Sequence, residues 1–468
     1  IIAELAEYSH PLLYATQLQY DIWTLMKNST VHIVGGGLAG SEAAYFLAER
    51  GISVKIHEMR PVATTEAHKT GLCAELVCSN SFKSKSPQSA PGILKSEMTR
   101  LRSLVLRTAE KHSVPGGEAL AVDRDLFAEA ITQTLKAHPQ IEILHEEVRR
   151  PFDSEITLIA TGPLTSDSLS QWIAQATRLD DLYFYDAIAP IIDAASIDMT
   201  SAFLANRYGK GDEEAYLNCP MNEEEYNQFI DALLVAEKVP PKSFEKEKFF
   251  QGCQPIEAIV ATGRDTLRFG PMKPVGLQDP TSGERPYAVV QLRPENQSKT
   301  AYNIVGFQTK LKYGEQLKVF RLIPALKKAE FLRLGSIHRN TFVCGPKVLR
   351  PDLAMRGNPQ IYLAGQVTGV EGYLESAACG LLAGIFIEQR INSKPHCAPP
   401  ANTALGALLR HIVNGNPDHY EPSNMHFGLF EHSFFENLTG FSREDTRKSI
   451  ALQATHHFSH WLKQCLLQ

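Results

Sequence analysis

The sequence predicts an α/β protein in which a Rossmann-like dinucleotide-binding domain is interrupted by a smaller α+β insertion domain. A strand, a glycine turn, a helix and a second strand follow one another over residues 31–58. The same alternation returns after residue 360, and the charge composition changes between these two regions. Because layered α/β folds alternate strands and helices in this way, the nucleotide-binding domain is expected to be discontinuous.

Apolar patterning supports the first elements. The run VHIVG at 31–35 is β-branched and apolar, which indicates a buried strand, and SVKIHE at 53–58 indicates a second. Between them, apolar residues recur at helical spacing over 41–50. The interval from about 60 to 92 is rich in Ser, Thr, Lys and Pro. We expect it to be an ordered functional loop.

Further elements follow in order. Helices are predicted over 93–112 and 123–137, and ITLIATG at 156–162 indicates a buried strand that ends in a turn of small residues. After residue 360, QIYLAGQ predicts another strand and SAACGLLAGIFIEQR another helix. In between, residues 212–237 carry eight acidic side chains and no Lys or Arg, whereas 310–339 carries eight Lys or Arg and two Glu. This polarity suggests an insertion with one acidic and one basic face.

These observations predict the domain boundaries. We expect an N-terminal extension over 1–25 that lies outside the fold, with Met26 as the natural start, because a strand begins soon after it. The extension has no Lys or Arg and no continuous apolar run, so it is not a signal peptide. The nucleotide-binding domain is predicted over 26–190 and 333–468, and the insertion domain over 191–332.

Composition excludes several classes of protein. The 468 residues are 43% hydrophobic and 21% charged, which is typical of a globular chain. The 47 Lys and Arg against 52 Asp and Glu give a net charge of −5, so contact with a nucleic acid would require a local basic patch. No apolar run reaches the roughly 18 residues of a membrane span. We therefore expect a cytoplasmic protein without a membrane partner.

The eight cysteines are scattered, and no two are spaced CxxC. This argues against a metal site or a disulfide framework and favours reduced thiols. Most free cysteines are small buried hydrophobes, and we apply this interpretation to five of them: Cys73, Cys344, Cys379, Cys397 and Cys465.

The strongest motif is Gly35-x-Gly37-x-x-Gly40, which spans Gly35, Gly36, Gly37, Leu38, Ala39 and Gly40. A tight turn, a close approach to a pyrophosphate and the packing of helix on strand each require a residue without Cβ. Glu58, at the end of the second strand, is suited to accept from ribose hydroxyls. The alternative is a glycine turn in an unrelated α/β protein.

FAD and NAD share this fingerprint, and two later segments favour FAD. The strand at 156–162 ends in Ala-Thr-Gly, a turn common beside a flavin nucleotide. The segment 362–384 offers Gly365 and Gln366 at a strand end, followed by a glycine-rich turn and a helix whose N-terminus could face a pyrophosphate or the flavin. Gln366 would contact the ribityl chain through its amide.

Two cysteines are candidates for thiol chemistry. Cys78 lies in AELVCSNSFKS, near Lys83 and Lys85, and Cys253 lies in QGCQPIE. A cysteine on a polar turn near cations can serve as a nucleophile or an acid. For both, the alternative of a buried hydrophobe stays open, and Cys219 is a weaker candidate.

Three basic regions are candidates for contact with RNA or an anionic cofactor. In 310–339, the cations Lys310, Lys312 and Arg321 are interleaved with Tyr313, Phe320 and Phe331, which are expected to be core residues rather than base-stacking ones. Arg268 and Lys273 flank a Gly-Pro turn in DTLRFGPMKPVGL. A helix over 95–111 carries five Lys or Arg.

Six motifs occur in the order of a known family: GGGLAGSEAAYFLAERGISVKIHEMRP, AELVCSNSFKS, GCQPIE, DTLRFGPMKPVGL, YNIVGFQTKLKYGEQ and AGQVTGVEGYLESAACG. From about Met26 to 430 the chain closely resembles the TrmFO family of folate- and FAD-dependent tRNA (uracil-5-)-methyltransferases, smaller relatives of the GidA flavoproteins. The resemblance implies a FAD-binding domain of the GidA or glutathione-reductase type.

The resemblance also implies a reaction. Reduced FAD would mediate carbon transfer from methylenetetrahydrofolate to C5 of uridine 54 in the tRNA T-loop, with NADH or NADPH as reductant. Cys253 corresponds to the nucleophile that adds to uracil C6, and Cys78 to a thiol that interacts with the flavin and assists removal of the C5 proton. Two alternatives are a ribosomal RNA uridine as target and a flavin oxidoreductase without methyl transfer. The oligomeric state is left open.

Overall fold

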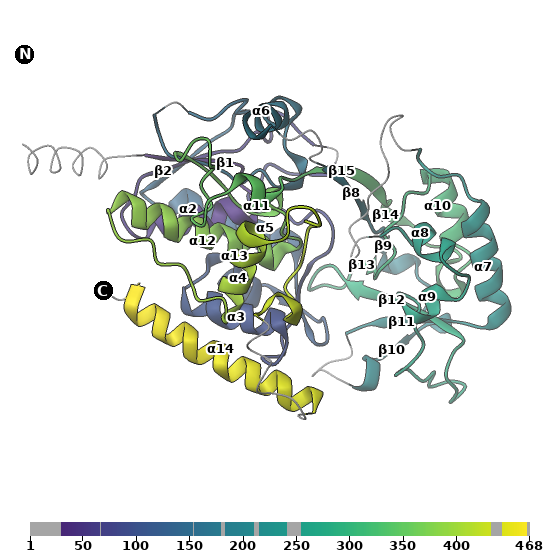
Figure 1. Cartoon of the computed structure of the whole chain (residues 1–468). Coiled ribbons are helices and arrows are strands. Elements are labelled where there is room, and N and C mark those ends of the chain that lie inside the picture. The colour runs from purple at the N-terminus through teal and green to yellow at the C-terminus, as the bar shows by residue number, and fades with distance from the viewer. Residues whose placement is uncertain are drawn as a thin grey trace, which may run out of the picture.

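The computed structural model describes residues 30–65, 67–152, 154–178, 183–209, 215–240, 254–431 and 442–465. The predicted extension over 1–25 and Met26 lie outside the described residues. Within this part of the chain, the molecule has two lobes, each with its own sheet (Figure 1).

The first lobe is built on a five-stranded parallel sheet in the order β16-β7-β1-β2-β6. Its strands are β1 (Val31–Val34), β2 (Val54–His57), β6 (Ile141–Leu144), β7 (Thr157–Ile159) and β16 (Ile361–Leu363). The three strands predicted before residue 165 are confirmed. The strand predicted after residue 360 pairs with β7, so sequence-distant segments complete one sheet.

Two helices cross closely over this sheet. α2 (Leu38–Ala48) follows β1, and α12 (Tyr373–Ile391) follows β16. A Cβ atom at Gly380 would lie 2.1 Å from the carbonyl oxygen of Ala39, so only glycine permits this approach. The long buried helix α12 thereby seats the second half of the lobe on the first.

The prediction of a single helix over 93–112 is wrong, because the structure has two helices there. α3 (Ala90–Arg100) ends before Arg102, which has φ +60°, and α4 (Leu104–Lys111) begins after Ser103, whose hydroxyl accepts from the N–H of Leu106. Ser is a strong N-cap, so the chain restarts its helix in a new direction there. α5 (Arg124–Ala137) agrees with the prediction.

The loop expected over 60–92 contains a short strand. β3 (Ser81–Ser84), β5 (Ala119–Val122) and β4 (Ser113–Val114) form a small antiparallel sheet. Since β3 follows Cys78 after two residues, this sheet fixes the C-terminal end of the AELVCSNSFKS motif within the first lobe.

The second lobe has an antiparallel six-stranded sheet in the order β10-β11-β12-β13-β9-β14. Its strands are β9 (Ile191–Asp193), β10 (Phe203–Leu204), β11 (Leu217–Met221), β12 (Ala288–Pro294), β13 (Ala301–Ile304) and β14 (Phe331–Arg333). Its helices are α7 (Glu223–Val235), α8 (Ile256–Ala261), α9 (Thr266–Phe269) and α10 (Tyr313–Phe320). They enclose a separate hydrophobic core.

Two strands and four helices complete the described fold. β8 (Tyr183–Ile188) and β15 (Ser336–Thr341) pair where the chain passes between the lobes (Figure 1). The helices are α6 (Asp167–Thr177), α11 (Gly345–Val348), α13 (Ala404–Asn414) and α14 (Arg443–Cys465). No helix among the described residues is long and apolar enough to cross a membrane.

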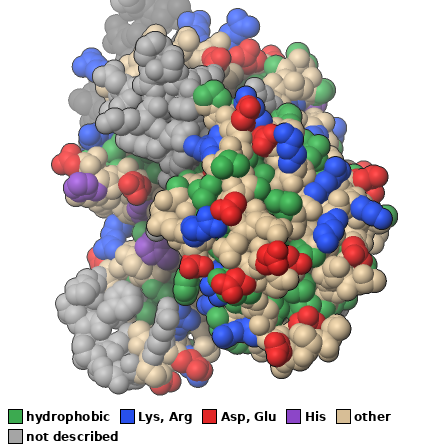
Figure 2. Space-filling view, turned by 90° about the vertical axis from the view of Figure 1, so that its right-hand side faces the viewer, with side chains coloured by type: hydrophobic (Ala, Val, Ile, Leu, Met, Phe, Trp, Pro, Cys, Tyr) green, Lys and Arg blue, Asp and Glu red, His purple; other side chains and the backbone are tan. Residues whose placement is uncertain are grey.

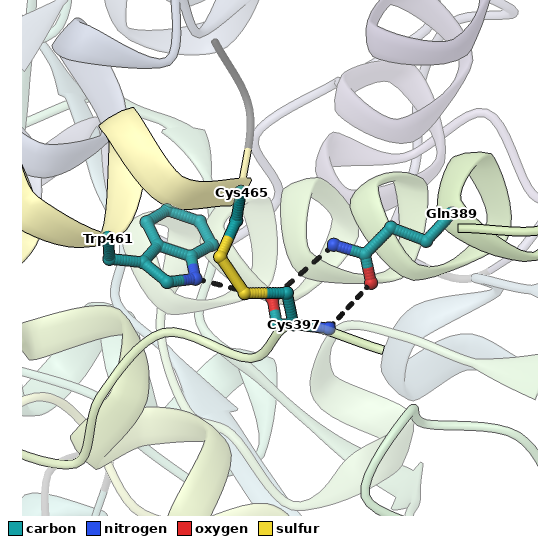
Figure 3. The surroundings of a disulfide bond; sticks show 4 residues. All are labelled: Gln389, Cys397, Trp461 and Cys465. Carbon is teal, nitrogen blue, oxygen red and sulfur yellow. Dashed lines mark hydrogen bonds between the residues drawn. A yellow bond between two sulfur atoms is a disulfide. The ribbon is translucent and has the colours of Figure 1, made fainter. Parts of the chain in front are cut away.

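A disulfide contradicts the expectation that all cysteines are separate thiols. Cys397 and Cys465 are bonded, and this bond attaches the end of α14 to the segment after α12 (Figure 3). The indole N–H of Trp461 donates to the carbonyl oxygen of Cys397 at 3.2 Å, and Gln389 makes hydrogen bonds to both backbone groups of Cys397. The two cysteines are 68 positions apart, and the sequence gave no signal for this pairing.

Candidate active site

The glycine turn has the geometry that a dinucleotide requires. Gly35 has φ +102°, and a Cβ there would lie 2.7 Å from the carbonyl oxygen of Ala160. A Cβ at Gly40 would lie 2.0 Å from the oxygen of Gly35. At Gly37, by contrast, the nearest atom would be 4.0 Å away, so the backbone there is open on the side that a phosphate would approach. Leu38 and Ala39 begin α2.

Glu58 connects the end of β2 to this turn. One carboxylate oxygen accepts the N–H of Gly36 at 2.9 Å, and the other accepts both the N–H and the Nε–H of Arg60, at 3.0 and 2.8 Å. Both side chains are buried. Burial alone would raise the pKa of Glu58, but the hydrogen bonds and charge of Arg60 outweigh it and hold this pKa below its ordinary value.

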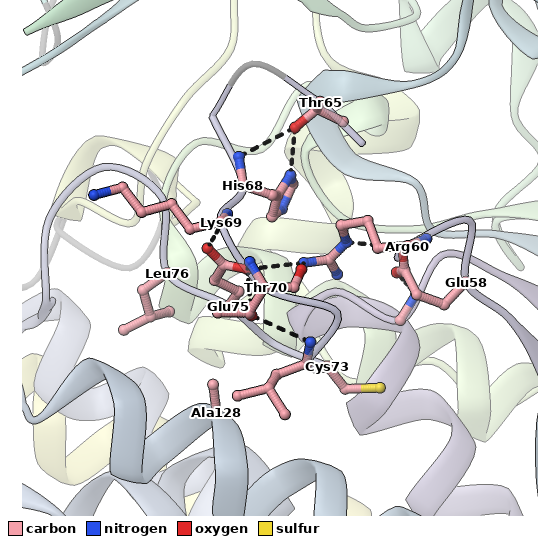
Figure 4. A network of polar contacts seen from close by, with 12 residues as sticks. Glu58, Arg60, Thr65, His68, Lys69, Thr70, Cys73, Glu75, Leu76 and Ala128 are labelled. Atoms are coloured by element: carbon pink, nitrogen blue, oxygen red, sulfur yellow. Dashed lines mark hydrogen bonds and ion pairs between the residues drawn. The ribbon is translucent and has the colours of Figure 1, made fainter. Parts of the chain in front are cut away.

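A second carboxylate extends the network outward (Figure 4). The Nη1 of Arg60 donates to Glu75 at 3.1 Å, and Glu75 also accepts the N–H groups of Lys69 and Thr70. The segment over 67–76 is therefore held against the glycine turn, where the N–H of Ala74 donates to the oxygen of Gly36 at 2.8 Å.

A pocket of about 520 Å³, which includes open solvent, lies at the carboxyl ends of β1, β2 and β7. Its lining includes Gly35, Gly37, Glu58, Arg60 and Thr161. In open parallel sheets, ligands bind outside the carboxyl ends of the strands. Of the residues predicted from spacing alone, Gly35, Gly37 and Glu58 thus line one pocket together, whereas Gly36, Leu38, Ala39 and Gly40 are not part of its lining.

The later candidates, Gly365 and Gln366, lie in the connection between β16 and α12. A Cβ at Gly365, which has φ +81°, would lie 2.9 Å from the Cβ of Ala39, so this glycine permits contact with α2. The amide nitrogen of Gln366 donates to Glu371 at 2.7 Å, which fixes the side chain. Gln366 lies in the short 3-10 helix η7 (Gln366–Thr368), just before α12.

Cys78 is half-buried in a polar setting between the lobes. Its backbone N–H donates to the hydroxyl of Tyr373 at 2.7 Å, and its carbonyl oxygen accepts from Arg124 at 2.8 Å and from Arg333 at 3.2 Å. Burial raises the pKa of Tyr373 well above its ordinary value, so this phenol stays neutral.

The cations that contact the Cys78 residue are arginines rather than the lysines expected from sequence proximity. Arg124 is largely buried and forms an ion pair with Glu295, the residue that follows β12. Lys83 instead pairs with Glu375 on α12 at 2.6 Å. Burial, with Arg124 nearby, lowers the pKa of Arg333.

Cys253 lies outside the described residues, and the described part of its motif begins at Gln254. The buried Glu257 accepts hydrogen bonds from the Thr309 hydroxyl and from the N–H of Lys310. The N–H of Ile256 donates to the oxygen of Gln308 at 2.8 Å. The end of the GCQPIE motif therefore rests on the FQTK segment that follows β13.

Three other cysteines fit the buried-hydrophobe interpretation. Burial raises the pKa of Cys73 and Cys379 to about 11 and that of Cys219 to about 12. These thiols are protonated at neutral pH and are therefore poor nucleophiles. Cys344 is half-buried rather than fully buried.

The basic candidates form several separate contacts. Arg268 stacks its guanidinium 3.5 Å from the ring centroid of Tyr287, and Lys273 lies in the turn that Arg207 holds through backbone oxygens. Lys312 pairs with Glu237 at 2.6 Å, and Arg321 donates to the oxygen of Ala329. The backbone of Lys310 contacts Glu257.

The expected separation into an acidic and a basic face is not seen on the outer side of the second lobe. Figure 2 shows Lys and Arg interspersed there with Asp and Glu. Among the aromatics of the basic stretch, Phe320 is a core residue as predicted and Phe331 packs against the core, but Tyr313 is 62% exposed.

The sequence did not predict several charged residues that contact the candidate residues directly or through one partner. Arg60, Glu75, Arg124, Glu295 and Arg333 each contact a candidate residue or its partner. Only Arg60 had a local signal, two residues after Glu58. No group of three or more His, Cys, Asp or Glu within the described ranges could hold a metal ion.

Comparison with known proteins agrees with this architecture. The chain matches the family model of glucose inhibited division protein A, GidA, over residues 30–395. Its fold is similar to that of Aquifex aeolicus GidA in the form II crystal, with a TM-score of 0.67 and 16% identity over 93% of this chain and 74% of that one. The fold and the glycine turn thus define a dinucleotide-binding protein of the GidA class.

Closer relatives narrow the class. A Geobacter sulfurreducens protein named methylenetetrahydrofolate--tRNA-(uracil-5-)-methyltransferase TrmFO is 50% identical over 433 residues, which are 92% of this chain and 98% of that protein. The Pelotomaculum thermopropionicum protein of the same name is 54% identical over 405 residues, 86% of this chain and 92% of that protein. This chain belongs to the TrmFO family of methyltransferases.

Proposed function

We propose that this protein transfers a one-carbon unit from methylenetetrahydrofolate to C5 of uridine 54 in the T-loop of tRNA, which gives 5-methyluridine. FAD is the cofactor, and NADH or NADPH is the reductant. The observation that carries this proposal is the 50% identity to the Geobacter sulfurreducens methyltransferase over nearly the whole of both chains. We also place this reaction in the cytoplasm.

The residues of the glycine turn fit FAD. The backbone at Gly37 is open toward the pocket, as a pyrophosphate requires, and the N-terminus of α2 favours negative charge. The carboxylate of Glu58 accepts three hydrogen bonds and has room for about four, so one oxygen can still accept from a ribose hydroxyl. When bound, FAD supplies the redox chemistry that couples carbon transfer to reduction of the carbon to a methyl group.

The protein's own groups activate the base. Uracil C5 is a poor nucleophile until a thiolate adds to C6 and creates an enolate, and we assign this addition to Cys253. We assign to Cys78 assistance in removing the C5 proton. Arg124 and Arg333 donate to the carbonyl oxygen of Cys78, and its N–H donates to the hydroxyl of Tyr373. These hydrogen bonds support this role, because they fix the backbone of Cys78 and use none of its side chain.

We also propose a division of labour between the lobes. Residues 26–190 and 333–468 form the FAD-binding domain, and residues 191–332 form an inserted domain that helps to bind tRNA. Arg268, Lys273, Lys310, Lys312 and Arg321 are its proposed RNA contacts, since each is a cation on or near the surface of the second lobe.

A substrate comparison tests the proposal. The purified holoenzyme is incubated with methylenetetrahydrofolate labelled in its transferable carbon, with NADH or NADPH, and with either a tRNA transcript or a ribosomal RNA fragment. We expect a flavin absorbance spectrum and label in tRNA alone. Label confined to ribosomal RNA, or oxidation of NADPH without any labelled RNA, would replace the proposed function with one of its alternatives.

A further inference from the structure

One face of the second sheet carries a row of four side chains, of which three are polar and one, Ile191, is apolar. In the antiparallel register, Arg293 on β12 pairs with Asn303 on β13, Asn303 pairs with Ile191 on β9, and Ile191 pairs with Arg333 on β14. Directly paired residues of an antiparallel sheet point to the same face. The neighbours Leu292, Tyr302 and Ile304 lie in the core of the second lobe, so this row faces away from that core.

A β-bulge brings Arg333 into the row. Phe331 pairs with Ile192 and Arg333 pairs with the adjacent Ile191, which leaves Leu332 unpaired and 56% exposed. Phe331 packs against the core, and the extra residue turns Arg333 to the opposite face.

The two ends of the row are attached to the segment that carries Cys78. The Nε–H of Arg293 donates to the side-chain oxygen of Asn80 at 2.9 Å. At the other end, Arg333 donates to the oxygen of Val77 at 2.9 Å and to that of Cys78 at 3.2 Å. Residues 77–80 therefore lie against this face of the sheet, with Asn303 between the two attachment points.

Two buried donors in this row have no partner within the described chain. They are the amide nitrogen of Asn303, whose side chain is 97% buried, and the Nε of Arg333. A buried N–H without an acceptor is energetically unfavourable, because it has lost its hydrogen bond to water and gained none in the protein. Other amides of the same sheet face are satisfied: the Asn218 nitrogen donates to three backbone oxygens, including that of Ala205 at 3.0 Å.

We infer that Asn303, which lies between Arg293 and Arg333, binds the uracil base of the substrate. Its amide nitrogen would donate a hydrogen bond to the carbonyl oxygen O4 of the uracil. This inference rests on the proposed function. Both unpartnered groups are donors, and uracil presents two carbonyl acceptors. The amide oxygen of an asparagine can also accept from uracil N3–H, so the side chain matches the edge of this base.

The location favours the base over the folate. β13, which carries Asn303, continues into the FQTK segment on which the end of the GCQPIE motif rests. The row is also attached to the segment that carries Cys78. Both cysteine motifs are proposed to act on the uracil. The pterin ring of the folate has no proposed reaction with either cysteine, so it has no need to lie near both motifs.

A base exchange tests this inference. Asn303→Asp is nearly isosteric but replaces the donor by a carboxylate oxygen, which repels O4 of uracil and accepts from the N4 amino group of cytosine. We measure KM for a tRNA transcript with U54 and the inhibition constant of the same transcript with C54. In Asn303→Asp, we expect KM for the U54 transcript to rise at least about 10-fold. We also expect the preference for U54 over C54 to fall at least about 10-fold, because a buried site that hydrogen-bonds one base rejects a base that leaves its polar groups unpaired.

Two further variants keep the test decisive. Asn303→Ala removes the donor without adding charge, and it replaces the aspartate variant if that variant does not fold. We expect it to reduce the preference for the U54 transcript over the C54 transcript. The control Asn218→Asp disrupts a fully satisfied amide on the same face and is expected to lower Tm with no change in that preference.

The outcomes separate the two claims. An unchanged U54 preference in folded Asn303 variants with normal flavin content would overturn the inference. A rise in KM confined to methylenetetrahydrofolate would overturn the assignment to the base and assign the row to the pterin carbonyl. If the wild-type enzyme transferred no carbon to any tRNA transcript, the proposed function itself would fail.

Discussion

Glu58 accepts the backbone N–H of Gly36 at 2.9 Å, so the acid at the end of β2 and the glycine turn after β1 form one structural unit. The two residues are 22 positions apart in the chain and meet because β1 and β2 are parallel neighbours. Arg60 completes the unit by pairing with the same carboxylate. The shape of the turn and the group that would face the ribose therefore depend on each other.

Glu58→Gln is expected to weaken FAD binding at least about 10-fold. The amide would turn an NH₂ toward Gly36 or Arg60, both of which are donors, and it would leave the buried Arg60 with less counter-charge. Titration of the apoprotein with FAD measures the change. The exposed Glu142→Gln on β6 is the matched control, and equal affinity in both variants would show that Glu58 does not support the cofactor.

Two glycine substitutions should have different effects. In Gly40→Ala, the new methyl group would lie about 2.0 Å from the Gly35 oxygen, so we expect a large loss of stability and little folded protein. In Gly37→Ala, the new methyl group meets no atom closer than 4.0 Å. Without FAD, the Tm of this variant should therefore stay near that of the wild type without FAD, while its affinity for FAD falls. Tm and flavin content measured side by side check this. Full flavin content in Gly37→Ala would contradict the proposed approach of the phosphate.

Local patterns explain what the sequence predicted well. The glycine turn, Glu58 and the strands of the first sheet follow from short-range spacing, because each needs only a β-branched run or a residue without Cβ. The break between α3 and α4 was missed because the apolar pattern continues across Ser103, where an N-cap restarts the helix.

Long-range contacts explain what the sequence did not predict. Arg124, Arg333 and Tyr373 meet at Cys78 from positions 46, 255 and 295 residues away, and a single sequence does not reveal such pairings. The Arg333 contact depends on a β-bulge between Phe331 and Arg333, and the residue that the bulge inserts cannot be recognised in a single sequence. The disulfide between Cys397 and Cys465 was missed for the same reason, since scattered cysteines carry no pairing signal.

Glu97 should make stability depend on pH. This buried carboxylate accepts the N–H groups of Ala404 and Leu405 at 2.8 Å, and burial raises its pKa from 4.5 to about 8. Below pH 4.5 the group is protonated in both the folded and the unfolded chain. As the pH rises toward 8, the unfolded chain loses its proton first, so the stability that Glu97 contributes falls across this window.

Glu97→Gln removes the titrating group and should therefore remove this pH dependence, although its NH₂ would face one of the two N–H donors and lower stability at every pH. Between pH 5.5 and 8.5 we expect the unfolding free energy of the wild type to fall relative to the variant by a few kcal/mol, as measured by urea denaturation. The exposed Glu129→Gln on α5 controls for general charge effects. Parallel pH profiles for the wild type and Glu97→Gln would refute the assignment.

The disulfide predicts a dependence of α14 on redox conditions. Chemical reduction should expose two additional thiols, and Cys465→Ser should increase proteolytic cleavage at α14 and lower stability by roughly 2–4 kcal/mol. The half-buried, unbonded Cys344→Ser serves as control. If mass spectrometry of the unreduced protein finds both Cys397 and Cys465 alkylated as free thiols, this prediction is wrong.

The most direct test of the central claim maps the methyl group on tRNA. A U54 transcript is incubated with methylenetetrahydrofolate, NADPH and the wild type, Cys253→Ala or Cys78→Ala, each with its flavin content measured, and nucleoside mass spectrometry locates any 5-methyluridine. We expect 5-methyluridine at position 54 with the wild type and a loss of at least about 100-fold in both variants. Methylation by Cys253→Ala at the wild-type rate, or a flavin-loaded wild type that forms no 5-methyluridine, would contradict it.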